Sequence, residues 1–245
     1  LKDSDGDENW HLVSTDIESR LARDLTPFAG LRAEGLITDR RHPHEVLVGL
    51  NLRDRRVGDI YRVNLETGAL RLDTANPGDV TEWLTDSTFT IRACVALDST
   101  TANTIIRIRD SARAPWRTLA TWKFELASTD REQRLIRFTR DGRGLQVLSP
   151  IGSSTTRFVT LDTRTGAVRD SLPADPRADV NCPFDFFNGV SSAQMLQHPV
   201  TGAIQAWTVQ YLKPEWKVVD YSIATDIALL EAVHTGVLSV DSRDD

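Results

Sequence analysis

Cysteine, methionine and aromatic residues are scarce in this chain of 245 residues. Its two cysteines, Cys94 and Cys182, lie far apart, which excludes a disulfide framework and a CxxC metal knuckle. No run approaches the roughly 18 apolar residues of a membrane-spanning helix, and no charged segment followed by an apolar one opens the chain as a signal peptide would. The sequence therefore predicts a globular protein away from the membrane, with both cysteines buried.

An excess of positive charge is also lacking. The net charge is −6 and the isoelectric point about 5.4, and basic stretches such as 53–56 are interrupted by acids. Such a chain has no long-range attraction for phosphate backbones, so nucleic-acid binding is disfavoured.

The nucleophile elbow G-x-S-x-G of α/β-hydrolases is missing too. The nearest glycine-serine stretches, around Ser153 and Ser191, lack the second glycine and lie between strand patterns, so both read as connecting loops. The sequence predicts no catalytic residue, no cofactor and no enzyme activity for this chain by itself.

Two groups of residues raise the question of a metal site. His42 and His44 could share a face but have no third ligand at a supporting spacing, which favours a solvated loop entering a strand. The run 3–8 alternates carboxylates as calcium loops do, but its glycine is misplaced and the final glutamate is missing, which favours an acidic hairpin turn. No metal site is predicted, and His11 is expected to be a packing or rim residue.

The chain does contain one sequence pattern, or phrase, that occurs four times: a short strand ending in a polar residue, a tight turn and a second short strand. Aligned on Asp16, Asn64, Asp110 and Asp162, the copies are 48, 46 and 52 residues apart. A period of roughly 40 to 50 residues filled with strands is the signature of propeller blades.

The predicted fold is an all-β propeller of four-stranded antiparallel blades, incomplete at about five blades, with one short helix near 225–235. The whole chain, 1–245, is expected to be one propeller segment without an α/β-hydrolase domain. The six tryptophans, one or two per repeat, are expected to pack between blades. The expected repeats are 1–30, 31–76, 77–122, 130–175 and 185–221, followed by the helix and the start of another blade at 222–245.

The helix is predicted because the apolar period changes to about 3.6 after Asp220. Ile227, Leu230 and Val233 or His234 would share a face, Thr225 or Asp226 would cap the start, and Gly236 would end the helix. The expected role is packing on the propeller rim. Residues 237–241 have the alternation of a strand opening another blade, and 181–197 read as an unusual insertion. Because both ends look like parts of blades, a fragment is expected.

Several phrases resemble the N-terminal propeller of prolyl-oligopeptidase-family serine peptidases, in the bacterial branch near acylaminoacyl peptidases and dipeptidyl peptidases. Their order and spacing are the specific part; the phrases are GDENWHL at 6–12, DLTPF at 24–28, HPHEVLV at 42–48, DIYRVNLETG at 59–68, NPG at 76–78, APWRTL at 114–119 and DPRADV at 175–180.

The resemblance implies a non-catalytic propeller that gates peptide access to a C-terminal α/β-hydrolase domain and docks that domain. Its partners would be this hydrolase domain and, in the full-length protein, a peptide substrate. Two alternatives stay open: a stand-alone propeller that binds proteins or peptides, and a propeller glycosidase with paired carboxylates. The cytoplasm is the expected location, with secretion left open because no initiator methionine is present.

Overall fold

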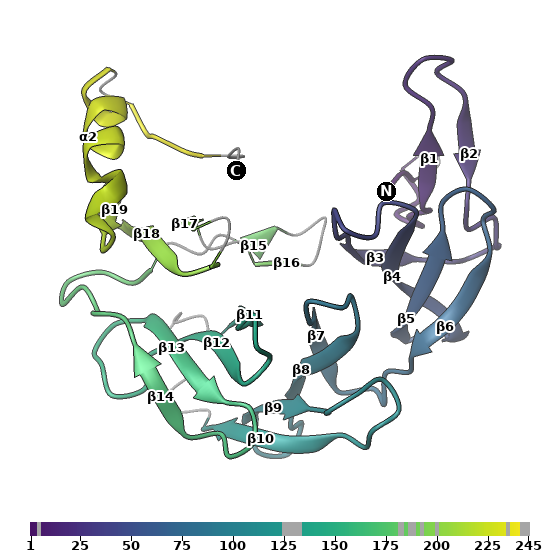
Figure 1. The fold of residues 1–245 in the computed structure, drawn as a ribbon. Helices are drawn as coiled ribbons and strands as arrows, with labels where there is room; N and C mark the ends of the chain where they lie inside the picture. The colour runs from purple at the N-terminus through teal and green to yellow at the C-terminus, as the bar shows by residue number, and fades with distance from the viewer. Residues whose placement is uncertain are drawn as a thin grey trace. The chain divides into compact units, whose positions relative to one another are not determined.

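The computed structural model describes residues 1–3, 6–123, 134–180, 184–185, 190–191, 194–198, 201–233 and 236–240. The regular structure of these residues consists almost entirely of antiparallel strands, with one short 3-10 helix and one α-helix (Figure 1). The chain divides into two compact units: residues 1–80 with 184–190, and residues 81–183 with 191–245. No helix in the described part of the chain is long and apolar enough to cross a bilayer.

The first unit contains a hairpin and a four-stranded sheet whose strands follow the sequence order. The hairpin pairs β1 (Val13–Thr15) with β2 (Ala22–Asp24), and the sheet joins β3 (Ala33–Ile37), β4 (Glu45–Asp54), β5 (Val57–Asn64) and β6 (Leu70–Thr74). An isolated antiparallel bridge joins Lys2 to His11, where the sequence predicted two strands of one blade. The short strands β15 (Phe184–Asp185) and β16 (Val190–Ser191) form a further two-stranded sheet.

The second unit contains three sheets, again in sequence order. They are formed by β7 (Val80–Thr85), β8 (Ile91–Leu97), β9 (Thr104–Ile108) and β10 (Arg117–Trp122); by β11 (Arg134–Phe138), β12 (Gly144–Ser149), β13 (Arg157–Asp162) and β14 (Val168–Ser171); and by β17 (Met195–Gln197), β18 (Ile204–Gln210) and β19 (Pro214–Val218).

Alternation along the strands explains why these sheets stack. On β12, Leu145 and Val147 join a core cluster with Ile106 and Trp122 of the preceding sheet. Leu148, on the opposite face, joins a second cluster with Trp207 of the following sheet. Successive side chains of a strand point to opposite faces, so an apolar residue at nearly every position means that both faces are covered. Trp122 and Trp207 pack between sheets, as the spacing of the tryptophans predicted.

The turn that follows Asp16, Asn64 and Asp162 in the repeated pattern occurs at five hairpins, but Asp110, aligned with them in the sequence, begins none of the five. In each, the amide of the fifth residue donates to the carbonyl of the first, and the fifth residue has a positive φ that favours glycine. The first side chain, an Asp or Asn in four of the five copies, accepts hydrogen bonds from the residues that follow it. These turns are Asp16–Arg20, Asn64–Gly68, Asp98–Ala102, Asp162–Gly166 and His198–Gly202.

An arginine ties the outer strand of one sheet to this turn in a neighbouring sheet. In the first unit, Arg23 of β2 donates to the carbonyls of Glu66 and Thr67, at 2.9 and 2.8 Å. In the second unit, Arg117 of β10 donates to the carbonyl of Thr163 at 2.6 Å. The repeated turn therefore serves as an anchor between sheets as well as a hairpin.

The helix departs from the prediction at its start and on its surface. Asp220, not Thr225 or Asp226, is the cap: its side chain accepts the Ser222 amide, and a 3-10 turn at Tyr221–Ile223 leads into α2 (Ala224–Val233). The sequence did not reveal this turn because it carries no strong helix signal. Of the predicted face only Ile227 is buried, whereas Leu230 is 49% and Val233 81% exposed.

The predicted fold class is confirmed in that the described residues form an almost all-β arrangement of antiparallel sheets with one short helix; three of the sheets have the predicted four strands, and the others have two or three. Residues 237–240 are not part of a strand, contrary to the alternation read there; the carbonyl of Leu238 instead accepts the Trp216 indole N–H. Cys94 is buried as expected, whereas Cys182, His234 and most of the predicted insertion at 181–197 lie outside the described residues.

Candidate functional site

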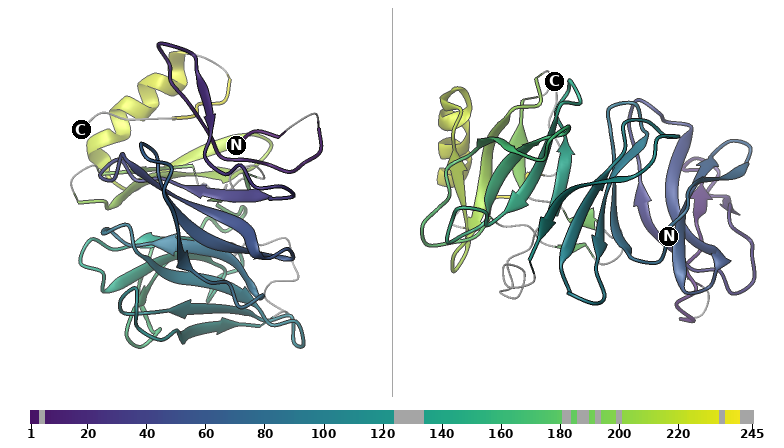
Figure 2. Two further views of the ribbon diagram at one scale, coloured as in Figure 1. Left: turned by 90° about the vertical axis from the view of Figure 1, so that its right-hand side faces the viewer. Right: turned by 90° about the horizontal axis from the view of Figure 1, so that it is seen from below.

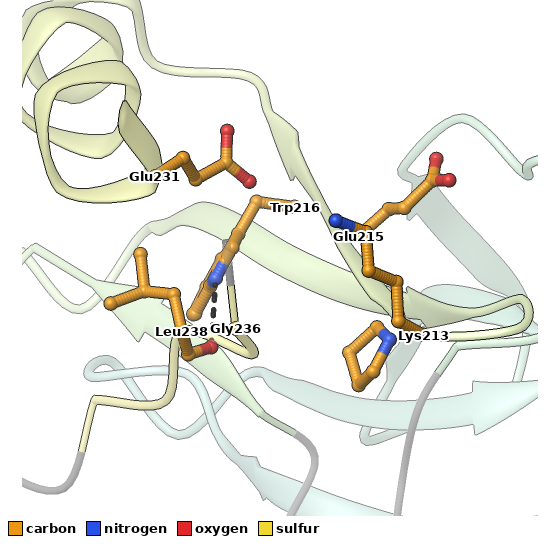
Figure 3. A pocket seen from close by; sticks show the side chains of 7 residues that line it. Lys213, Glu215, Trp216, Glu231, Gly236 and Leu238 are labelled. Carbon is orange, nitrogen blue, oxygen red and sulfur yellow. Dashed lines mark hydrogen bonds between the residues drawn. The ribbon is translucent and has the colours of Figure 1, made fainter. Parts of the chain in front are cut away.

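A hollow of about 480 Å³ opens on the second unit between β19, α2 and the segment after the helix (Figure 3). Helix α2 stands beside the last strands of this unit (Figure 2). The lining combines an indole ring, aliphatic groups and charges of both signs, from Lys213, Pro214, Glu215, Trp216, Glu231, Gly236 and Leu238.

Trp216 forms one wall because of its place on β19. The ring packs against a small apolar cluster that contains Ala206, Ile223 and Ile227. Its Nε1 donates to the Leu238 carbonyl at 3.2 Å, which fixes the segment after the helix over the indole (Figure 3). A half-buried tryptophan whose polar atom is satisfied presents an apolar ring face to a ligand.

The charges around the hollow come from two elements. Glu231 extends from α2, while Lys213 directly precedes β19 and Glu215 lies on it (Figure 3). The seven lining residues include no serine, cysteine or histidine, so the hollow holds no nucleophile with a neighbouring base. The lining residues instead offer an indole face, aliphatic groups and charged groups of both signs.

The other face of β19 carries a cluster centred on Asp175. The Tyr211 hydroxyl donates to Asp175 Oδ1 at 2.6 Å, and Lys217 Nζ lies 3.0 Å from Oδ2. The Tyr211 hydrogen bond, the Arg177 amide and Lys217 hold the pKa of Asp175 well below its usual range. Burial and the Asp175 carboxylate raise the pKa of Tyr211. Arg177 lies over the Tyr211 ring, 4.7 Å from its centroid.

This cluster fixes the chain that leads into the last sheet. Besides Asp175, the side chain of Asp179 accepts the Thr156 amide at 2.6 Å, and the Val180 amide donates to Thr156 Oγ1 at 2.9 Å. Sequence reasoning missed both the hollow and this cluster. Tyr211 and Lys217 are 36 and 42 positions from Asp175, and the only signal was the DPRADV phrase, noted for its family resemblance.

Two of the three histidines singled out in the sequence, His11 and His44, lie beside a carboxylate. His11 Nδ1 is 2.7 Å from Asp24 Oδ2, and His44 Nδ1 is 2.8 Å from Glu66 Oε1. The His42 amide donates to the Asp39 carbonyl. The structure does not bring His42 and His44 together with a third ligand, and no cluster of three metal-binding side chains occurs among the described residues.

The acidic run and the two serines also have structural partners. Asp7 accepts both the backbone amide and the side-chain amide of Asn9, as an acidic turn would; Asp5 lies outside the described residues. Ser153 belongs to a loop in which its amide donates to the Pro150 carbonyl and its hydroxyl accepts the Thr155 amide. For Ser191 only the backbone is described, in β16.

Two arginines of the first unit hold three carboxylates. Arg53 forms two hydrogen bonds of 2.8 Å with Asp59, whose side chain is fully buried. Arg62 bridges Glu45 and Asp73 at 3.0 and 3.1 Å. Carboxylates neutralised in this way are structural, and they give no support to the glycosidase alternative.

Comparison with known proteins identifies relatives. No family model matches the chain. Over 243 residues, 99% of its length, the chain is 33% identical to dipeptidyl aminopeptidase BIII of Pseudoxanthomonas mexicana, and it spans 33% of that protein.

Two solved structures have a similar fold. One is a puromycin-hydrolysing peptidase of Mycobacterium tuberculosis, with a TM-score of 0.58, 14% identity and coverage of 91% of this chain and 36% of that one. The other is TolB from Acinetobacter baumannii, with a TM-score of 0.53, 14% identity and coverage of 86% and 46%. At this identity the likeness concerns the fold alone.

Proposed function

Because this chain is a β-propeller segment related to prolyl-oligopeptidase-family peptidases, we propose that it is the non-catalytic propeller of a serine peptidase. In this role it restricts peptide access to an α/β-hydrolase domain of the same protein and docks that domain. The observation that carries the proposal is the 33% identity to a dipeptidyl aminopeptidase along 99% of the chain. The relative's name supplies the reaction class, hydrolysis near the N-terminus of a peptide.

Two features of the second unit support a docking role. The hollow beside α2 has no nucleophile among its lining residues, which suits a binding element. Helix α2 exposes Leu229, Leu230 and Val233, and apolar side chains gathered on one helix are expected to be covered by a partner. The hydrolase domain is the proposed cover of these exposed side chains.

The gating proposal is tested in the full-length protein with peptides of increasing length. Short peptides should be cleaved and long unfolded chains should not, because a propeller admits only what fits its channel. Equal rates for long chains and short peptides would contradict gating.

Docking is tested with Leu230→Asp on α2, which should lower the rate for short peptides. Leu212→Asp, at an exposed position outside α2, is the control and should leave the rate unchanged.

A further inference from the structure

One arginine of the second unit is held only by neutral partners. Arg137 lies on β11, the first strand of its sheet. Its Nε donates to the side-chain oxygen of Gln146 on β12 at 2.7 Å, and its Nη1 donates to that of Gln197 on β17 at 2.5 Å. The guanidinium thus bridges the first strands of two consecutive sheets.

This arrangement differs from that of three other arginines in the chain. Arg53, Arg62 and Arg92 each form an ion pair with a carboxylate, whereas Arg137 forms none with any carboxylate that the structure describes. Burial lowers the pKa of Arg137. Withdrawing a charge from water without a counter-charge is unfavourable, so an anion that reaches this group gains a favourable contact.

The free edge of the guanidinium has the geometry for such an anion. Nε and Nη1 each use one donor on a glutamine, and Nη2 donates to no described residue. A guanidinium carries more N–H groups than these two acceptors use, and its paired Nη donors match the two oxygens of a carboxylate. Gly202 makes room, because a Cβ there would lie 2.6 Å from Nη1.

We propose that the free edge of Arg137, between β11 and β17, binds the carboxylate of a short peptide. This inference rests on the proposed function and adds a ligand group to it. In a propeller the sheets surround a central channel, and the first strands lie next to that channel. A carboxylate is the chosen anion because its two oxygens match the paired donors of one guanidinium and it is the anionic group that every peptide with a free C-terminus carries.

The test compares two forms of one peptide on this chain by isothermal titration. An N-acetylated tripeptide with a free C-terminal carboxylate should bind at least about tenfold more tightly than the same peptide with a C-terminal amide. Arg137→Gln should reduce binding of the acid to the level of the amide. Arg32→Gln removes an exposed arginine paired with Glu34; as the control, it should bind like the parent chain.

A second variant keeps the test decisive if Arg137→Gln does not fold. Gln197→Glu has nearly the same shape and places a carboxylate where Nη1 already donates, so it should keep the melting temperature and lose binding of the acid peptide by about tenfold. Equal binding of acid and amide, or unchanged binding by a folded Gln197→Glu, would overturn the inference. Gating is measured separately by peptide length, so either proposal can fail while the other stands.

Discussion

Gly6 and Gly166 both have a backbone conformation with positive φ, which favours glycine. Gly166 has φ of +75°, and a Cβ on it would collide with the Leu119 carbonyl oxygen of the neighbouring sheet. Gly6 has nearly the same φ, +76°, with no atom within 4 Å of such a Cβ. The pair separates the effect of the backbone angle from that of the close approach.

Gly166→Ala should therefore lower the free energy of unfolding by more than about 2 kcal/mol, because a left-handed backbone and a collision both oppose it. Gly6→Ala should cost only about 1 kcal/mol, from the backbone angle alone. Urea denaturation of both variants measures the difference. Equal losses would mean that the contact with Leu119 has no energetic role.

Asp175 gives the chain a defined response to acid. Its pKa is lowered first by the Tyr211 hydrogen bond and further by the Arg177 amide and Lys217. A carboxyl whose pKa is lower in the folded than in the unfolded chain stabilises the fold above its unfolded pKa of about 3.9. This stabilisation is lost as the pH falls below that value toward the folded pKa.

Asp175→Asn should thus be less stable than the parent chain at neutral pH, and the gap in free energy of unfolding should narrow below about pH 4. Denaturation curves between pH 7 and the acid range measure the gap. Glu18→Gln, on the exposed β1–β2 hairpin, is the control and should show little difference at either pH. A constant gap for Asp175→Asn would show that the carboxylate charge is not what stabilises this cluster.

At the scale of elements, helix α2 packs against its own unit through one buried residue, Ile227. Ile227 is 4% exposed and packs with Ile223 and Ala206, while its neighbours Leu229 and Leu230 remain exposed. The exposed residues give the helix an apolar surface that its own unit does not use.

Ile227→Ala should cost about 2 to 4 kcal/mol in free energy of unfolding because it leaves a cavity among packed side chains. Leu230→Ala should change stability by less than about 0.5 kcal/mol, since the side chain is half exposed. Chemical denaturation of both variants checks the contrast. A large loss for Leu230→Ala would indicate that its face is packed within the chain.

At the scale of the whole molecule, the two units each have a core, and the sheets of the second unit share clusters on both faces. The stacked sheets hold the strands and turns in place. The residues that line the hollow of the second unit include no nucleophile with a neighbouring base.

The chain by itself should therefore show no turnover of dipeptide or ester substrates, because nothing at the described sites is an activated nucleophile. The measurement is release of a chromogenic leaving group at high protein concentration. Ser153→Ala is the informative variant: turnover that disappears with this substitution would contradict a non-catalytic role.

Much of the local structure of this protein could be predicted from the sequence alone. Strand positions, turns with glycine at positive φ and the blade-like order of strands all follow from alternation and short-range hydrogen bonds, which is why β4, β5, β12 and β13 lie close to where the pattern placed them. The family relation was also readable, because the matching phrases are contiguous.

Tertiary structure decided what depends on distant residues meeting. Arg137 meets Gln197 sixty positions away, Asp175 meets Tyr211, and Leu238 covers Trp216; no local period encodes such pairs. The start of the helical segment was likewise set by Asp220, which caps the 3-10 turn before α2 and accepts a hydrogen bond from the Gln205 side chain. Side-chain partners brought together by sheet stacking carry the candidate sites, because stacking joins segments that sequence patterns treat as independent.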